Sequence, residues 1–236
     1  MVPAAWFTGR EVYMHKVANM MPKRQAIGMS IFVVYKYMTP ERYDKMLAVL
    51  GRRQADLTVI LENVFDPHNV SAVMRSCDAV GIQDVYVLNT RVPHYKKWGF
   101  KSSSSASKWL TVHRFESVDE CLAAVRLKYD RVLCAYLDDN ATDLYELDFT
   151  GSLALVFGNE IDGVSTECRS LSDGGFIIPQ MGIIHSLNIS VACAVTLYEA
   201  LRQKRLGGHY DRRDTALPEK QDLLARWTAH PKQQKP

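Results

Sequence analysis

The stretch Leu57–Gly81, LTVILENVFDPHNVSAVMRSCDAVG, decides the fold class. It opens with Leu57–Leu61, a short and largely apolar run that is typical of a strand buried in a sheet. A polar loop follows, and Asn69–Val80 then reads as a helix, which ends at Gly81 because glycine readily adopts the left-handed backbone of a helix C-terminus. A second apolar run, Val85–Leu88, comes next. This strand–helix–strand order predicts two parallel strands joined by a helix.

Strands and helices keep alternating after this unit. Most of the predicted strands are uniformly apolar, which is typical of a parallel sheet covered on both faces. The sequence therefore predicts an α/β fold with a mostly parallel sheet and helices on both faces. Further strands are expected at Trp109–Val112, Arg131–Leu137, Leu153–Phe157 and Phe176–Ile178, and further helices at Ser117–Lys128, Val164–Leu171, Ser186–Arg205 and Glu219–Trp227.

Four segments are expected along the chain. Residues 38–56 carry an N-terminal helix that begins with Thr-Pro-Glu, a cap followed by proline at the first helical position. Residues 57–206 hold the sheet domain, and residues 207–236 form a basic C-terminal extension. Residues 1–37 show no clear periodicity, and we expect them to be poorly ordered or to reflect an over-long gene start.

The composition excludes several classes of protein. The 236 residues are 47% hydrophobic and 23% charged, which is an ordinary globular mixture. No apolar run is long enough for a membrane helix or for the apolar region of a signal peptide. The five cysteines are widely spaced with no CxxC pair, and the histidines show no metal-ligand spacing. We therefore expect a cytoplasmic protein with reduced thiols, no structural metal and no membrane partner.

Basic residues are concentrated at both ends of the chain. Residues 57–200 carry a net charge of −7, whereas residues 201–236 carry +5 and residues 1–37 carry +4. Within the acidic middle, Arg91–Lys108 holds five basic residues, no acidic residue and several interleaved aromatic residues. Cations attract phosphates and aromatic rings stack on bases, so this composition fits a nucleic-acid contact. A solvated loop with a few core aromatics fits it equally well.

Three loops at predicted strand ends hold unusual polar residues. The first, Glu62–Asn69, leads to Arg75. Taken singly, Asn69 fits the cap at the start of a helix, and Arg75 fits a surface charge. The second, Phe157–Gly163, has glycines around acidic residues, where a backbone can approach a ligand, although a strand-to-helix turn explains it better when it is taken alone. The third, Ile178–Asn188, suits a ligand with apolar and polar parts, or a plain crossover.

Together, the three loops resemble the signature motifs of the SpoU/TrmH family of S-adenosylmethionine-dependent RNA 2′-O-methyltransferases, within the SPOUT superfamily. The motifs occur in family order, and the resemblance runs from about Met38 to Trp227. It implies a trefoil knot in the C-terminal part of the sheet domain. The matching stretches are PHNVSAVMRSCDAVG at Pro67–Gly81, LVFGNEIDGVSTE at Leu155–Glu167 and IPQMGIIHSLNISVACAV at Ile178–Val195.

Within that family, the chain is most similar to the TrmH type, which acts on a D-loop guanosine of tRNA. The stretches RRQADLTVILENV at Arg52–Val64 and GGHYDRRDTALPEKQDLLARW at Gly207–Trp227 carry this likeness. It implies helical N- and C-terminal extensions, a homodimer, and methyl transfer to the ribose 2′-hydroxyl at position 18 of tRNA. The alternatives are a relative that acts on ribosomal RNA or another tRNA position, and an RNA-binding module that has lost catalysis.

The resemblance places the family's catalytic arginine at Arg75. Because guanidinium stays protonated near neutral pH, we expect Arg75 to bind the phosphate beside the target ribose, so that a phosphate oxygen receives the hydroxyl proton. Asn69 is expected to hold the Arg75 loop. Glu160, Ser186 and Asn188 match active-site positions, and we expect them to fix Arg75 and the methionine end of the cofactor by hydrogen bonds.

The resemblance also implies where the ligands bind. Backbone groups read the adenine of S-adenosylmethionine, so apolar side chains suffice around it. His185 stands where many TrmH-type sequences carry Gln, as a neutral substitute or as a source of mild pH dependence. The expected cofactor contacts are Ala135, Leu137, Gly158, Ile178, Met181, Ser186 and Leu187. The expected RNA contacts are Arg52, Arg53, Lys96, Lys97, Lys101, Lys108, Arg202, Arg205, Arg212 and Arg213.

Overall fold

The computed structural model describes residues 38–92, 106–137, 141–184, 186–211, 215 and 217–229. Contacts divide the chain into two compact units, one of Met1–Tyr43 with Thr228–Pro236 and one of Asp44–Trp227. The second unit holds the sheet. Several predictions lie outside the described residues: those for residues 1–37, Lys96, Lys97, Lys101, His185, Arg212 and Arg213.

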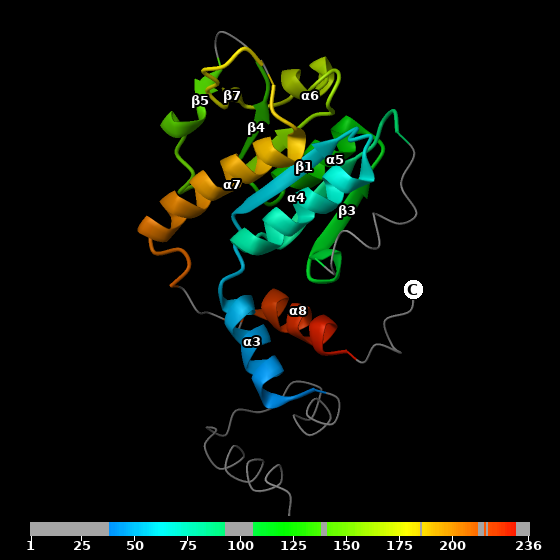
Figure 1. The fold of residues 1–236 in the computed structure, drawn as a ribbon. Helices are drawn as coiled ribbons and strands as arrows, with labels where there is room; N and C mark the ends of the chain where they lie inside the picture. The colour runs from blue at the N-terminus through cyan, green and yellow to red at the C-terminus, as the bar shows by residue number, and fades with distance from the viewer. Residues whose placement is uncertain are drawn as a thin grey trace, which may run out of the picture. The chain divides into compact units, whose positions relative to one another are not determined.

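The centre of the second unit is a seven-stranded sheet in which every strand pair is parallel (Figure 1). This confirms the predicted α/β class. The strand order is β3-β2-β1-β6-β4-β7-β5, so β1 lies inside the sheet, between β2 and β6, although it comes first of these strands in the chain. The strands are β1 (Leu57–Glu62), β2 (Asp84–Leu88), β3 (Thr111–Phe115), β4 (Arg131–Ala135), β5 (Thr142–Asp143), β6 (Leu153–Phe157) and β7 (Gly175–Ile177).

The register brings the carboxyl ends of the central strands level with one another. Leu61 of β1 pairs with Val87 of β2 on one side and with Phe157 of β6 on the other. Farther along the sheet, Ala135 of β4 pairs with both Phe157 and Phe176. The loops that follow β1, β6, β4 and β7 therefore leave the sheet along one edge, where open parallel sheets commonly bind ligands.

Helices cover both faces of the sheet, as predicted. On one face, α4 (Pro67–Val80) and α7 (Ile189–Leu206) share a buried cluster with alternate strand residues such as Val59. On the other face, α5 (Val118–Arg126) and α6 (Thr166–Ser170) pack with the intervening residues such as Ile60. This alternation is why the strands read as continuous apolar runs rather than as a polar–apolar alternation.

Local capping explains where the helices begin and end. The α4 helix begins two residues before the predicted start, because Asp66 caps it by accepting a hydrogen bond from the backbone N of His68 at 2.8 Å. It ends where predicted, at Gly81, whose φ of 88° is left-handed. The α7 helix begins at Ile189 rather than Ser186, because Asn188 is its cap.

Two strand predictions need correction by two residues or more, and one strand was missed. The third strand is Thr111–Phe115 rather than Trp109–Val112, because pairing with β2 begins at Asp84 and Thr111. The fourth ends at Ala135 rather than Leu137. The two-residue strand β5 was not predicted; two residues are too few to show a periodicity.

The remaining elements are two helices and two short 3₁₀ turns. The helix α3 (Pro40–Gly51) confirms the predicted Thr-Pro-Glu start, and α8 (Pro218–Thr228) confirms the predicted C-terminal helix. The 3₁₀ turns are η1 (Ala106–Lys108) and η2 (Leu144–Glu146). Across the described ranges, no helix is both long and apolar enough to cross a membrane.

Arg53 is buried, whereas a side chain that contacts an RNA phosphate must lie on the surface. Its side chain is only 3% exposed and donates hydrogen bonds to Ile82 O at 2.9 Å and to Asp78 Oδ1 at 2.6 Å. The guanidinium also lies over the ring of Trp227, 5.2 Å from its centre. Arg53 therefore joins α8 to the sheet and to α4, and the expectation of an exposed cation is wrong.

Candidate functional site

Three side chains from the three sequence motifs meet at the carboxyl edge of the sheet. Asn69 stands in the first turn of α4, Glu160 in the loop after β6, and Asn188 at the start of α7. The side-chain amide of Asn69 donates to Glu160 Oε1, and that of Asn188 donates to Asn69 Oδ1 at 3.2 Å. The geometry thus joins residues that the sequence separates by 91 and 119 positions.

The direction of this hydrogen-bond chain is set by the cap of α7. Asn188 Oδ1 accepts from the backbone N of Ser190 at 2.9 Å and from its hydroxyl at 2.6 Å. The amide nitrogen of Asn188 is therefore the group left to donate toward Asn69. The chain ends at the carboxylate of Glu160, so a charged acceptor strengthens its last hydrogen bond.

The loop after β6 is a closed turn that holds Glu160 in place. Asn159 Oδ1 accepts from the backbone N of Ile161 at 2.8 Å and from that of Asp162 at 2.7 Å. A Cβ on Gly158 would collide with the backbone carbonyl of Gly163, and Gly163 itself has a φ of 68°. The loop's own backbone thus requires glycine at Gly158, whatever ligand lies near it.

Glu62, the last residue of β1, forms a hydrogen bond to the far end of this loop. The sequence analysis did not include it among the expected site residues. Its side chain is buried, and its Oε2 accepts from the backbone N of Ser165 at 2.9 Å. Among the described residues its Oε1 has no hydrogen-bond partner, and Glu62 lines a cavity of about 120 Å³ behind the loop. Its position, an acidic residue directly after an apolar run, was the feature of the sequence that could have identified it as a site residue.

The neighbouring Asn63 adopts an unusual backbone conformation. Its φ is 50°, a left-handed value that costs most residues roughly 1–2 kcal/mol. Its side-chain oxygen accepts from the backbone N of both Thr90 and Arg91 at 2.9 Å, which offsets that cost. Arg91 then pairs with Asp162 at 3.6 Å, across two exposed side chains. The polar loop that precedes α4 is therefore connected, through Arg91, to the loop that carries Glu160.

Arg75 and Ser186 stand apart from the three joined residues. Arg75 lies six positions after Asn69 on α4, so helical geometry turns it to another side of the helix. Both Arg75 and Ser186 are exposed, and neither makes a hydrogen bond or ion pair with another described residue. The polar contacts expected to fix Arg75 instead link Asn69, Glu160 and Asn188 to one another.

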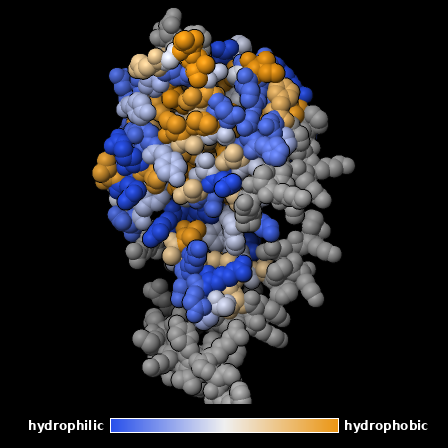
Figure 2. Space-filling view, in the orientation of Figure 1, coloured by the Kyte–Doolittle hydropathy of each residue, from blue (hydrophilic) through white to orange (hydrophobic). Residues whose placement is uncertain are grey.

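The residues expected to hold the cofactor lie along the same edge of the sheet. Ala135 ends β4, and Leu137 follows it. The β7–α7 loop carries Ile178, Met181 and Leu187. Apolar side chains are exposed there: Met181 is 95% exposed and Leu137 is 65% exposed. Hydrophobic surface also gathers in the upper half of the face in Figure 2, in the part of the view where Figure 1 shows the loop into α7.

This edge therefore fits a ligand with both apolar and polar parts. A loop with exposed apolar side chains can cover the rings of an adenosine, and the neighbouring Asn188 and Glu160 can hold a charged amino-acid end. In the part of the chain that is described, no group of three or more His, Cys, Asp or Glu side chains is placed to hold a metal ion.

Four of the expected RNA-contact residues are described and exposed. Arg52 follows α3, Lys108 ends η1, and Arg202 and Arg205 lie in the last turns of α7. Arg202 forms an ion pair with Glu199 at 2.7 Å, and the hydrogen bonds that it donates to the Glu199 carboxylate raise the pKa of Arg202.

Several known proteins that are similar to this chain in sequence and fold are named as RNA methyltransferases. The tRNA (guanosine(18)-2′-O)-methyltransferase of Thermus thermophilus is 39% identical over 191 residues, which cover 80% of this chain and 96% of that protein. The crystal structure of the A. aeolicus TrmH/SpoU tRNA modifying enzyme matches with a TM-score of 0.73 and 32% identity, over 83% of this chain and 96% of that one.

A second solved structure and a family model also match this chain. The SpoU methyltransferase AviRb of Streptomyces viridochromogenes in complex with the cofactor AdoMet matches with a TM-score of 0.58 and 28% identity, over 65% of this chain and 59% of that one. Residues 56–198 match the family described as the SpoU rRNA Methylase family. Since this match spans more than half of the chain, the protein belongs to the SpoU methylase family.

Proposed function

We propose that this protein is a tRNA (guanosine-2′-O-)-methyltransferase that modifies guanosine 18 in the D-loop, with S-adenosylmethionine as methyl donor. The observation that carries the proposal is the hydrogen-bond chain from Asn188 through Asn69 to Glu160, which joins all three family motifs at one edge of the sheet. Relatives named for this activity match most of the chain, which supports the choice of substrate.

The proposed cofactor site uses the loops after β4, β6 and β7. S-adenosylmethionine supplies a methyl group on a positively charged sulfur, which is a good electrophile. Around it, backbone groups would read the adenine, and the exposed apolar side chains would cover the rings. The residues that would hold the cofactor are Ala135, Leu137, Gly158, Ile178, Met181, Ser186 and Leu187. In this proposal, the segment around them is threaded as a trefoil knot.

Arg75 has the central role in the proposed chemistry. A ribose hydroxyl is a weak nucleophile, so it must be aligned and must lose its proton during transfer. The exposed guanidinium of Arg75 would bind the neighbouring phosphate through two parallel hydrogen bonds. A phosphate oxygen would then lie beside the hydroxyl and receive its proton. Asn69, Glu160 and Asn188 would hold the loops around this group.

The remaining surfaces complete the proposal. Arg52, Lys108, Arg202 and Arg205 would contact RNA phosphates, as would Lys96, Lys97, Lys101, Arg212 and Arg213. Residues 38–56 and 207–236 would act as helical extensions that help to hold the tRNA. We further propose a homodimer, in which both subunits frame one RNA site, working in the cytoplasm.

The direct test is methyl transfer from labelled S-adenosylmethionine to unmodified tRNA and ribosomal RNA transcripts, followed by mapping of the modified nucleotide. Label on the ribose of a D-loop guanosine would support the proposal. Label on ribosomal RNA or at another tRNA position would keep the chemistry and overturn the substrate. No label, combined with tRNA binding, would indicate an RNA-binding module without catalysis.

A further inference from the structure

The ion pair between Arg91 and Asp162 lies beside the joined motifs, and the proposed chemistry does not use it. Arg91 follows β2 in the chain, and Asp162 stands in the loop after β6, two residues after Glu160. Because an extended chain spans at most about 3.6 Å per residue, the Cα atoms of Glu160 and Asp162 lie within roughly 7 Å of each other. Arg91 therefore reaches the turn at which the hydrogen-bond chain of the three motifs ends.

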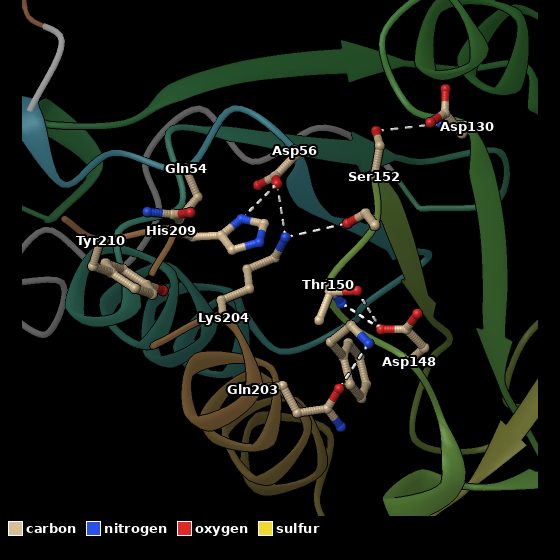
Figure 3. A network of polar contacts seen from close by, with 12 residues as sticks. Gln54, Asp56, Asp130, Asp148, Thr150, Ser152, Gln203, Lys204, His209 and Tyr210 are labelled. Atoms are coloured by element: carbon tan, nitrogen blue, oxygen red, sulfur yellow. Dashed lines mark hydrogen bonds and ion pairs between the residues drawn. The ribbon is translucent and has the colours of Figure 1, made fainter. Parts of the chain in front are cut away.

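This ion pair is long and exposed. The distance between Arg91 Nη1 and Asp162 Oδ2 is 3.6 Å, which is too long for a hydrogen bond, and the two side chains are 61% and 58% exposed. By contrast, Lys204 Nζ contacts Asp56 Oδ2 at 2.8 Å near the amino end of β1, and the Lys204 side chain is fully buried (Figure 3). Exposed ion pairs contribute little to stability, so Arg91 can exchange Asp162 for another anion at little cost.

The guanidinium of Arg91 has five N–H donors, and within the described part of the chain none of them makes a hydrogen bond. Its backbone, however, is held in place by Asn63. The side-chain oxygen of Asn63 accepts from the backbone N of Thr90 and of Arg91, both at 2.9 Å, and its amide nitrogen donates to Thr90 Oγ1 at 2.9 Å. The left-handed backbone of Asn63 is strained, and strain of this kind is concentrated at functional sites. The base of the Arg91 side chain is thus fixed, while its charged end can change partner.

A second guanidinium lines the same space. Arg91 and Arg169 both line the cavity of about 120 Å³ behind the Glu160 loop. Arg169 is an exposed residue of α6, and its side chain is held by a hydrogen bond to Thr166 Oγ1 at 3.2 Å and by the ring of Tyr136, whose centre lies 5.2 Å away. A ligand that enters from solvent can therefore meet two cationic side chains here.

The charges around this cavity favour a phosphate group. Two acidic residues also line it, and both are engaged: Glu62 is 1% exposed and accepts from the backbone N of Ser165, and Asp162 is the group that an incoming anion would replace. The planar donor set of a guanidinium matches the oxygens of a phosphate through two parallel hydrogen bonds. Such a contact is stronger than the single long contact that Arg91 makes with Asp162.

We propose that Arg91, assisted by Arg169, binds a backbone phosphate of the RNA substrate, and that this phosphate displaces Asp162 from Arg91. It is a different phosphate from the one assigned to Arg75, and it is held on the other side of the Glu160 loop from the methyl donor. The identification of the RNA as tRNA rests on the proposed function. Arg91 would contribute to substrate affinity rather than to the methyl-transfer step.

The test is equilibrium binding of an unmodified tRNA transcript to the full-length protein over a range of salt concentrations, with methyl transfer measured on the same samples. Arg91→Gln should weaken binding about fivefold to tenfold, with kcat little changed. It should also lower the slope of log affinity against log salt by roughly 0.7 to 1, because one phosphate contact is lost. Asp162→Asn should have the opposite effect and strengthen binding about twofold to fivefold, because Arg91 no longer gives up a partner.

The double variant separates exchange from general repulsion. In the Arg91→Gln background, the gain from Asp162→Asn should disappear, because no guanidinium is left to be released. An equal gain in both backgrounds would mean that Asp162 only repels RNA, and would overturn the inference. Arg126→Gln is the matched control, since Arg126 forms a partly exposed ion pair with Asp173 at 3.0 Å near the start of β4 and should leave tRNA affinity unchanged.

Methyl transfer distinguishes this inference from the proposed function. Normal methyl transfer with unchanged tRNA affinity in Arg91→Gln would overturn the inference and leave the proposed function intact. RNA binding that depends on Arg91, without methyl transfer to tRNA, would support the phosphate site and overturn the proposed function. If inorganic phosphate binds through Arg91 while Arg91→Gln leaves tRNA affinity unchanged, the site takes a free anion, and the assignment to RNA is overturned.

Discussion

Asn69 donates a hydrogen bond from its side chain to Glu160, and through this contact the helix after β1 meets the loop after β6. The same amide accepts from Asn188 at 3.2 Å, so its two ends engage two different motifs. The amide of Asn69 can do both, whereas a carboxylate has no donor and a hydrocarbon has neither group. Asn69 is therefore the residue on which the joining of the motifs depends.

Replacing Asn69 should reduce catalysis more than stability. Asn69→Ala removes both contacts and should lower kcat/KM for tRNA about 100-fold, the loss expected from a misplaced catalytic loop. Asn69→Asp should be worse, because it sets a carboxylate against that of Glu160. Methyl-transfer kinetics and thermal melting check this, with Ser76→Ala on the same helix as control. Equal activity of the Asp and Asn forms would contradict the assigned geometry.

Arg75 should act as a phosphate ligand rather than as a base. Arg75→Ala should lower kcat by at least about 100-fold, and Arg75→Lys should retain part of it, because lysine keeps the charge and loses the two-pronged geometry. Binding of S-adenosylmethionine should be unchanged in both variants, as measured by calorimetry. Normal turnover of Arg75→Ala would eliminate this role.

Glu62 should act as a positioning residue through Ser165. Glu62→Ala leaves the backbone N of Ser165 without its acceptor and releases one end of the Glu160 loop, so kcat should fall about 10-fold to 100-fold while the KM for tRNA changes little. Glu62→Gln keeps an oxygen acceptor and should recover most of the activity. A purely structural role predicts instead that both variants lose stability in proportion to their loss of activity.

Asp84 should make part of the stability depend on pH. Burial alone would raise the pKa of Asp84, but hydrogen bonds from His113 and Lys128 outweigh it and lower the pKa. The contribution to stability is therefore present above the unfolded-state pKa of about 3.9 and is lost as the pH falls through the lower folded-state value.

The corresponding experiment is urea unfolding of Asp84→Asn and of the unaltered protein. Because Lys128 is partly exposed, we expect Asp84→Asn to lower the free energy of unfolding by only about 1–2 kcal/mol at pH 7. This difference should become smaller below pH 4. Asp130→Asn, on an exposed side chain, is the control and should cost little at either pH. If the difference in unfolding free energy between Asp84→Asn and the unaltered protein stays constant across this pH range, the charge of Asp84 contributes nothing to stability.

The elements of the fold were predictable from the sequence where local chemistry determines them. Gly81 ended α4 and the Ser117 cap began α5 because each signal acts within one turn. The strand order was not predictable: β1 lies between β2 and β6 because of packing between distant segments, which no local pattern encodes. For the same reason β5 could not be predicted: its two residues form a strand because they pair with β7, which is distant in the sequence.

The candidate site was predictable in its residues but not in its contacts. Asn69, Glu160 and Asn188 were identified by their motifs, yet their mutual hydrogen bonds require the strand order that brings three loops together. Arg53 was misjudged because a basic pair after a helix is usually exposed, whereas here Asp78 and Trp227 bury it. Burial of a charge depends on its partner, which lies far away in the sequence.

The most direct test of the central claim uses two tRNA transcripts that differ by one atom. One carries guanosine at position 18 and the other carries 2′-deoxyguanosine there, so only the methyl-accepting oxygen is removed. We expect one methyl group per molecule on the first transcript, none on the second, and similar binding of both. Equal methylation of the deoxy transcript would show that the protein modifies another atom or another nucleotide.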